Sequence, residues 1–281
     1  MYFLRRLYVV LLAPLLFSTA LARAADDAAV PFTSEHNQIV IQVKVAKAGP
    51  FSMLLDTGTT PSAIDTALAH QLGLELRGKG NATLLPGVQV GSLQIDSLDG
   101  GAIDLTSVAR AVGVPIQGVL GHSFFANRIV QIDYPHHLVR FLASAPPASP
   151  NGFALPFAVE SDEPIIHVTV NGTPLSAVLD TGFGGVAVLN PQAIDRLGLG
   201  EQVAGMQATS GVGFGGSSAL RKGKIASLEV GGYVVNNPDV TFRLKGGRFD
   251  HMPADLNIGN GLLQAFVVTF DYQQDIITFQ R

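Results

Sequence analysis

The pattern of apolar and polar positions repeats along this chain, and the repeat centres on one short phrase. Apolar pairs at 54–55 and 178–179 each run directly into Asp-Thr-Gly, at 56–58 and 180–182. An apolar run that stops at a turn signal is typical of a buried strand, and the glycine permits a tight turn directly after that strand. Each Asp is therefore placed at the end of a core strand, where a lone charge is costly. Two such carboxylates in matching contexts indicate that they meet.

The residues before each phrase match as well. Alternating apolar and polar positions predict strands over 39–45 and 165–170, followed by turns at 46–49 and 171–173. The second turn contains Asn-Gly, the strongest short hairpin signal. Each half therefore begins with a hairpin whose second strand ends on the Asp.

Both copies are followed by a short predicted helix. In the second copy Asn190 is placed as the N-cap, Pro191 takes the first helical position, and Gly198 follows the last apolar turn. Asp65 and Gly73 take the matching places in the first copy.

The two halves also close alike, with an apolar-apolar-Gly segment, an Asp-Tyr hairpin and a final strand. The corresponding segments are 119–125 with 257–263, 129–134 with 267–272, and 138–142 with 276–280. The two Asp-Thr-Gly phrases are 124 positions apart, whereas Gly121 and Gly259 are 138 apart, so the second half carries about 14 extra residues. The chain is an internal duplication.

On these motifs the chain resembles the retropepsin-like and pepsin-like aspartic proteases, in the form that carries two Asp-Thr-Gly lobes in one polypeptide and is exported by bacteria. The resemblance covers nearly all of the chain after residue 24. It implies a mainly β fold of two duplicated retropepsin-like lobes with a central cleft.

The lobe boundary is indicated by a Pro/Ala/Ser-rich linker at 143–152. Lobe one is then expected over 25–142 and lobe two over 153–281. The linker could be a flexible tether or a stiff strap across a joined interface.

The first 24 residues have the features of a secretory signal peptide. Arg5 and Arg6 precede an apolar stretch at 7–17, and small-x-small sites place cleavage after Ala24. The alternative is an uncleaved anchor, but the stretch is short for a span of about 20 residues. We expect export to the periplasm or outside the cell, with no membrane attachment after cleavage.

The composition of the chain limits the kinds of partner that it is expected to bind. Only 14% of residues are charged, the net charge is −4, and no Lys/Arg run appears, which argues against nucleic acid. The chain has no Cys and 31 Gly, which fits a β protein without disulfides. His122, His136 and His137 lack ligand spacing, so we expect no metal and no other cofactor.

The resemblance assigns the catalytic role to Asp56 and Asp180. Two carboxylates within about 3 Å share a proton and titrate as a coupled pair. The ionised one can act as general base on a water, and the protonated one can hydrogen-bond the scissile carbonyl. The residues alone do not say which Asp is the base.

The resemblance also assigns supporting roles. Thr57 and Thr181 are expected to brace the two loops across the lobe interface, and Gly58 and Gly182 to let backbone N–H groups approach the carboxylates.

One position departs from the two-lobed pepsin-like pattern. There, a hydroxyl residue after Asp-Thr-Gly commonly bonds the outer oxygen of the Asp. Thr59 fits this pattern, whereas the second copy has Phe183.

A glycine-rich segment at 210–217 is a candidate substrate-covering flap, with Gly211, Gly213, Phe214 and Gly215 as its residues. It also matches Gly-x-Gly-x-x-Gly, but 206–209 is a poor strand and 218–224 a poor helix, so a dinucleotide loop is disfavoured. The segment 80–87 has the same place in lobe one and has no flap Tyr.

Together these features predict an aspartic endopeptidase acting on extended peptides, and a monomer because the two lobes pair by a pseudo-twofold within one chain. The alternative is a non-catalytic peptide-binding module that retains the fold. Two intact Asp-Thr-Gly copies favour the enzyme, whereas Phe183 and the missing flap Tyr favour the module. A structural β protein with coincidental Asp-Thr-Gly turns does not explain the repeated surroundings.

Overall fold

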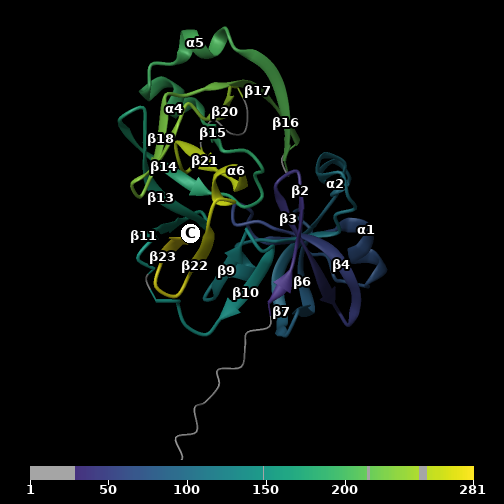
Figure 1. Ribbon diagram of the computed structural model, residues 1–281. Coiled ribbons are helices and arrows are strands. Elements are labelled where there is room, and N and C mark those ends of the chain that lie inside the picture. The colour runs from purple at the N-terminus through teal and green to yellow at the C-terminus, as the bar shows by residue number, and fades with distance from the viewer. Residues whose placement is uncertain (1–28, 148, 214–215, 247–251) are drawn as a thin grey trace, which may run out of the picture.

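The computed structural model describes residues 29–147, 149–213, 216–246 and 252–281. They form two β lobes and a third sheet that the lobes share (Figure 1). The first 28 residues, on which the signal peptide is predicted, lie outside the described part. No helix among the described residues is both long and apolar enough to span a bilayer.

Lobe one contains a seven-stranded sheet and three short helices. In sheet order the strands are β2 (Thr33–Glu35), β3 (Gln38–Val45), β4 (Ala48–Leu55), β8 (Gly118–Leu120), β5 (Ser62–Asp65), β7 (Leu93–Ile103) and β6 (Ala82–Val90). The helices are α1 (Thr66–Gln71), α2 (Thr106–Val112) and α3 (His122–Phe125).

Lobe two contains a ten-stranded sheet and three further helices. In sheet order the strands are β16 (Gln207–Gly213), β17 (Gly216–Lys224), β20 (Asp239–Arg243), β15 (Ala187–Leu189), β21 (Leu256–Ile258), β14 (Thr173–Leu179), β13 (Glu163–Val170), β18 (Ser227–Val230) and β19 (Tyr233–Asn236), and β12 (Ala158–Glu160) pairs with β13. The helices are α4 (Pro191–Arg196), α5 (Gly200–Ala204) and α6 (Asn260–Leu263).

The shared sheet joins the lobes. Its order is β1 (Val30–Pro31), β10 (Leu138–Leu142), β9 (Ile129–Asp133), β22 (Val267–Asp271), β23 (Ile276–Gln280) and β11 (Phe153–Pro156). β9 and β22 come from equivalent places in the two halves and pair antiparallel at its centre. One continuous hydrophobic cluster runs through this sheet into both lobes, so the lobes share a core.

The two lobes place their Asp-Thr-Gly phrases by the same strand arrangement. In lobe one β4 runs parallel to β8, which is antiparallel to β5, and in lobe two β14, β21 and β15 repeat this pattern. β4 and β14 end just before Asp56 and Asp180. The mainly β, duplicated fold predicted from the repeat is confirmed.

The predicted helix start at Asn190 is only partly right. α4 begins at Pro191 as expected, but the Asn190 side chain makes no capping hydrogen bond. Its amide is engaged by other groups described below. Asp65, in contrast, caps α1 by accepting from the N–H groups of Ala67 and Leu68.

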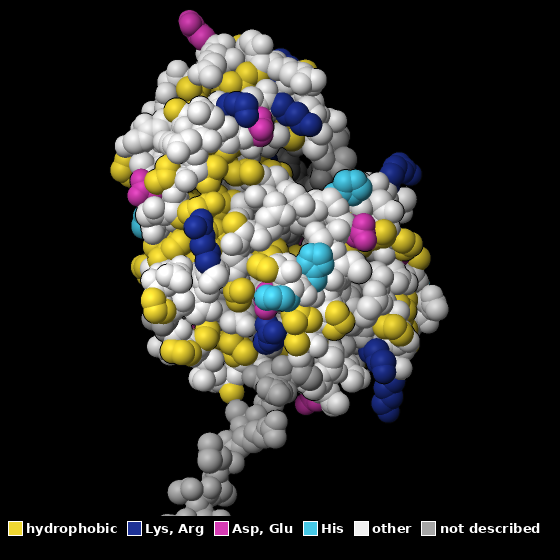
Figure 2. Space-filling view, viewed as in Figure 1, with side chains coloured by type: hydrophobic (Ala, Val, Ile, Leu, Met, Phe, Trp, Pro, Cys, Tyr) yellow, Lys and Arg dark blue, Asp and Glu magenta, His cyan; other side chains and the backbone are white. Residues whose placement is uncertain are grey.

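The lobes differ most at the hairpin of β16 and β17. The residues 207–213 form a strand, contrary to the expectation for 206–209, and β16 arches from lobe two to contact α2 of lobe one (Figure 1). In lobe one a tight turn closed by paired bonds between Arg77 and Ala82 takes its place. The hairpin therefore accounts for extra residues of the second half, and Figure 2 shows the surface hollowed on the inner side of the arch.

Candidate active site

Asp56 and Asp180 lie together where the two lobes meet. The Asp56 N–H donates to the Leu120 carbonyl at 3.0 Å, and the Asp180 N–H to the Ile258 carbonyl at 2.8 Å, so each Asp is fixed by the same type of strand contact. The two carboxyl groups are close enough that each shifts the pKa of the other. Asp56 is buried, with 4% of its surface exposed, whereas Asp180 is partly exposed.

The two following threonines bind across the interface. The Thr57 hydroxyl donates to the Leu179 carbonyl at 2.6 Å and accepts from the Thr181 N–H at 3.1 Å. Thr181 reciprocates, because its hydroxyl donates to the Leu55 carbonyl at 2.8 Å and accepts from the Thr57 N–H at 3.0 Å. Both side chains are fully buried, so these bonds hold the two Asp loops at one separation.

The two glycines allow the loops to cross closely. The Gly58 N–H donates to Asp56 Oδ1 at 2.8 Å, and the Gly182 N–H to Asp180 Oδ1 at 3.0 Å. A Cβ on Gly58 would lie 2.7 Å from the Asp180 carboxyl carbon, and one on Gly182 would collide with the Asp56 carboxyl group. A side chain at either position would therefore separate the carboxylates.

The outer oxygens of the two carboxyls have different partners. Thr59 Oγ1 donates to Asp56 Oδ2 at 2.7 Å. On Asp180 Oδ2 the donor is Asn257 Nδ2, at 2.9 Å. Asn257 in β21 therefore supplies the contact that Phe183 cannot make.

Further side chains hold the Asp180 loop, one from β3 of lobe one and one from α6 of lobe two. Gln38 Nε2 donates to the Gly182 carbonyl at 2.6 Å, and Asn260 Nδ2 donates to the Thr181 carbonyl at 2.6 Å. The Tyr134 hydroxyl orients that amide by donating to Asn260 Oδ1 at 2.6 Å.

The family model described as aspartyl protease matches this chain twice, over residues 41–124 and 166–260. Each match contains one Asp-Thr-Gly loop and its surrounding strands. The chain belongs to the aspartyl protease family. This confirms the resemblance drawn from the repeated motifs.

Other comparisons are less close. A solved structure of a retropepsin-like aspartic protease from Rickettsia conorii shares 16% sequence identity, with 46% of this chain and 89% of that one covered and a TM-score of 0.34. A search of curated proteins found no match.

In this aspartyl protease family member the two carboxyls are electrostatically unequal. Burial, and next the charge of Asp180, raise the pKa of Asp56 to about 8, although Thr59 and Gly58 donate to it. Burial also raises the pKa of Asp180, but the Asn257 amide and the Arg243 charge oppose this. Asp180 is therefore the carboxyl better suited to carry the negative charge.

The remaining sequence candidates are less central. Gly211 and Gly213 lie in β16 of the arching hairpin, while Phe214 and Gly215 lie outside the described residues. His122 Nε2 is 3.8 Å from Asp162 Oδ1, and His136 bonds Asp133. In the described ranges no three His, Asp or Glu side chains are grouped as metal ligands would be.

Sequence reasoning missed Asn257, Gln38 and Asn260. For Asn257 a signal was present, because an amide interrupts the apolar run at 256–258 where lobe one has Val119. Gln38 and Asn260 act on backbone carbonyls far away in sequence, and neither position carries a local pattern.

Proposed function

We propose that this aspartyl protease family member is an active aspartic endopeptidase that hydrolyses peptide bonds with water activated between Asp56 and Asp180. The observation that carries the proposal is the contact between the two carboxyls, held by the reciprocal Thr57 and Thr181 bonds. A retained but inactive fold would not need a buried acid kept in contact with a second acid, because burying that charge is costly.

The chemistry needs only the shared proton and one water. The ionised carboxyl removes a proton from a water molecule while the water oxygen attacks the scissile carbonyl carbon. The other carboxyl gives its proton to the carbonyl oxygen. Collapse of the tetrahedral intermediate breaks the C–N bond. The amide nitrogen takes the proton held by the first carboxyl, and the second carboxyl recovers one from the hydroxyl group.

The substrate we propose is a peptide in extended form, lying between the carboxyls and the hairpin of β16 and β17. Both Asp loops come from one chain, so we propose that a monomer is sufficient. We also propose export, on the strength of the sequence at 1–24. Sedimentation of the purified chain and N-terminal sequencing of the exported protein test these two points.

The function itself is tested by incubating the purified chain with a mixed peptide library between pH 3 and 8 and identifying products by mass spectrometry. The expected result is cleavage that Asp180→Asn abolishes. Asp239→Asn is the matched control, because among the described residues this exposed Asp forms its ion pair with Lys224, at 2.9 Å, and the variant should cleave like the parent.

If parent and Asp180→Asn are equally inert while peptides still bind, as measured by fluorescence anisotropy, the endopeptidase proposal is wrong. The chain would then be the peptide-binding module that was the alternative. Two features favour that module: Phe183 after the second phrase and the lack of a flap Tyr in lobe one.

A further inference from the structure

Lobe two carries a chain of polar side chains behind Asp180. Asn257 Nδ2 donates to Asp180 Oδ2 at 2.9 Å, and Arg243 Nη1 contacts Asn257 Oδ1 at 3.4 Å and Asn190 Oδ1 at 2.8 Å. An amide has one donor end and one acceptor end. A cation at Asn257 Oδ1 therefore turns the NH₂ group toward Asp180.

Lobe one has no such chain at the equivalent positions. Strand pairing makes Asn257 equivalent to Val119, because each is paired with the residue two before its Asp. By the same reasoning Arg243 corresponds to Ile103, which pairs with Asp65, the counterpart of Asn190. The environments of the two carboxyls therefore differ at register-equivalent positions.

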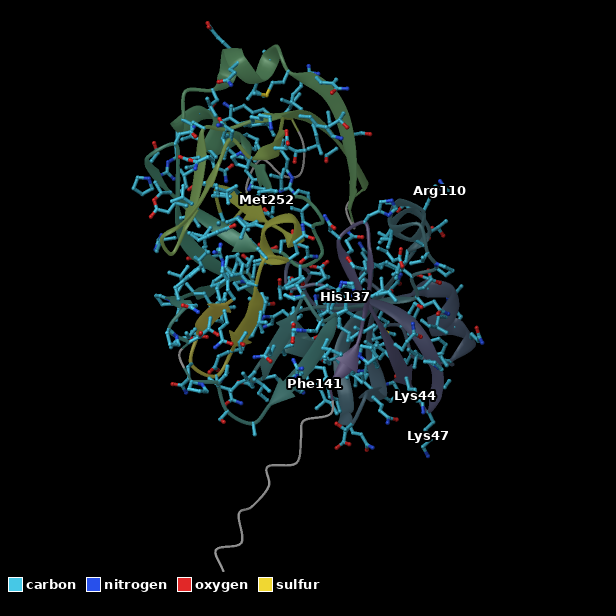
Figure 3. All side chains as sticks on the ribbon, viewed as in Figure 1. Lys44, Lys47, Arg110, His137, Phe141 and Met252 are labelled. Carbon is cyan, nitrogen blue, oxygen red and sulfur yellow. The ribbon has the colours of Figure 1, made fainter. Side chains whose placement is uncertain are left out.

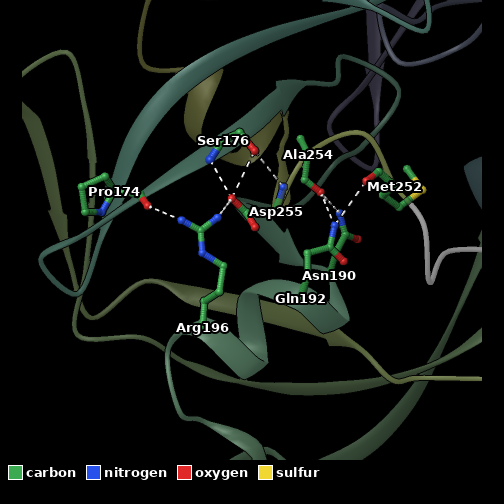
Figure 4. Close-up of polar contacts among 8 residues, drawn as sticks. All are labelled: Pro174, Ser176, Asn190, Gln192, Arg196, Met252, Ala254 and Asp255. Atoms are coloured by element: carbon green, nitrogen blue, oxygen red, sulfur yellow. Dashed lines mark hydrogen bonds and ion pairs between the residues drawn. The ribbon is translucent and has the colours of Figure 1, made fainter.

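The polar chain is anchored at its far end (Figure 4). Asn190 is fully buried, and its Nδ2 donates to the Ala254 carbonyl at 2.8 Å. The buried Asp255 accepts from Arg196 Nη1 at 2.6 Å and from both the N–H and the hydroxyl of Ser176. These contacts fix the start of β21, and so fix Asn257 before any substrate binds.

A third acid opposes this arrangement. Glu163 begins β13, and the register that pairs Ile165 with Val178 places it across from Asp180. Its Oε2 is buried and has no hydrogen-bond partner among the described residues. Burial, and then the Asp180 charge, raise the pKa of Glu163 to about 7, while Arg243 lowers it.

The charged groups around Asp180 thus come from three neighbouring segments of the described chain. They are Asp56 after β4, Glu163 on β13 and Arg243 on β20. Arg243 is the positive charge among them, and with the Asn257 amide it favours a negative Asp180.

We propose that Asn257 and Arg243 are positioning residues that make Asp180 the carboxylate that activates water and leave the shared proton on Asp56, with Glu163 opposing them. The role of Asp180 in activating water rests on the proposed endopeptidase function. The location of the shared proton on Asp56 does not depend on that function.

The test is a pH titration of the protein labelled with ¹³C at Asp carboxyl carbons, followed by NMR. Asp56→Asn and Asp180→Asn spectra assign the two signals. Arg243→Met removes the charge, and Arg243→Lys keeps it. Glu163→Gln removes only the opposing charge and breaks no hydrogen bond at Oε2, so it remains informative should Arg243→Met fail to fold.

In the parent, Asp180 should titrate at lower pH than Asp56. Arg243→Met should move the Asp180 midpoint up by about one pH unit, Glu163→Gln should move it down, and Arg243→Lys should keep most of the parent value. Loss of packing alone would not give opposite shifts. Titration of Asp56 first, or shifts of the two charge-removing variants in the same direction, would overturn the proposal.

Peptide cleavage by the same samples separates the two proposals. If the parent cleaves, the acidic limb of kcat/KM should move with the NMR midpoints. If the parent is inert but the NMR shifts are as expected, the endopeptidase proposal is wrong, and the proposal that the shared proton resides on Asp56 is supported.

Discussion

At the scale of single residues, the hydroxyls of Thr57 and Thr181 each do two things that no apolar isostere can do. Each donates to a carbonyl of the opposite lobe and accepts an N–H from it, with all four groups buried. A buried N–H without an acceptor lowers the stability of the folded state by about 1–3 kcal/mol, and a buried carbonyl without a donor has a similar cost. The separation of Asp56 and Asp180 therefore depends on these two side chains.

Thr57→Val is expected to lower the free energy of unfolding by about 2–4 kcal/mol, because it strands the Thr181 N–H and the Leu179 carbonyl. Cleavage of a reporter peptide should be lost with it. Thr57→Ser keeps the hydroxyl and is the control. Urea unfolding and a peptide assay measure both effects, and equal stability of the Val and Ser variants would contradict the bracing role.

The residues of this site that could be predicted from sequence are those with a local pattern. Asp-Thr-Gly after an apolar pair marked Asp56 and Asp180 and suggested the threonines and glycines beside them. Asn257 stood out as an amide in an apolar run, but its contact, like that of Gln38, could not be assigned, because the groups they contact are brought near by strand register and lobe packing. Register depends on the whole sheet.

At the scale of elements, the two halves differ by one hairpin. Lobe one turns tightly between Arg77 and Ala82, whereas lobe two extends β16 and β17 across to α2. In the sequence, the glycine-rich segment at 210–217 marked this region as a candidate flap. The strand over 207–213 was not predictable from its Ser- and Gly-rich pattern, because in the described part of the chain β16 is an edge strand that pairs with β17 alone and buries little.

We expect the hairpin to hold substrate against the carboxyls, as lids do in other enzymes. Joining Thr209 to Leu220, a paired position of β16 and β17, through the four-residue turn 78–81 of lobe one removes the arch. The melting temperature should stay close to the parent value while kcat/KM on peptides falls about tenfold or more, that is, by at least about 1.4 kcal/mol of transition-state stabilisation.

Lys44→Ala is a suitable control for this variant, because Lys44 lies on lobe one away from the arch (Figure 3) and is exposed. It should cleave as the parent does. Undiminished cleavage by the shortened variant would mean that the arch does not cover substrate.

At the scale of the whole molecule, the lobes form one folding unit. The central pairing of β9 with β22 and the common hydrophobic cluster mean that neither lobe completes the shared sheet alone. The linker contacts the shared sheet, since Gln280 Nε2 donates to the Pro147 carbonyl at 3.3 Å. This favours a strap over a tether, a choice that depends on contacts between distant segments and so was open in the sequence.

Keeping the buried Asp56 in contact with a second acid lowers the stability of this folding unit. The pKa of Asp56 is raised from 3.8 to about 8 in the folded chain, so between these pH values the folded state keeps a proton that the unfolded state has lost. The free energy of unfolding must then fall as pH rises, by up to about 1.4 kcal/mol per pH unit. Below pH 4 and above pH 8 this contribution no longer changes.

Asp56→Asn replaces the acid by a neutral amide of the same size and should remove much of this slope. We expect the variant to be inactive but more stable than the parent at pH 7, and the advantage to shrink toward pH 5, where the parent Asp56 is protonated. Urea unfolding at pH 5, 6 and 7 measures the slope, with Asp239→Asn as a control that should follow the parent. If the free energy of unfolding falls equally with pH in the parent and in Asp56→Asn, the pair of acids is not the cause of the pH dependence. If it falls less steeply in Asp56→Asn, the site is maintained at the expense of the stability of both lobes together.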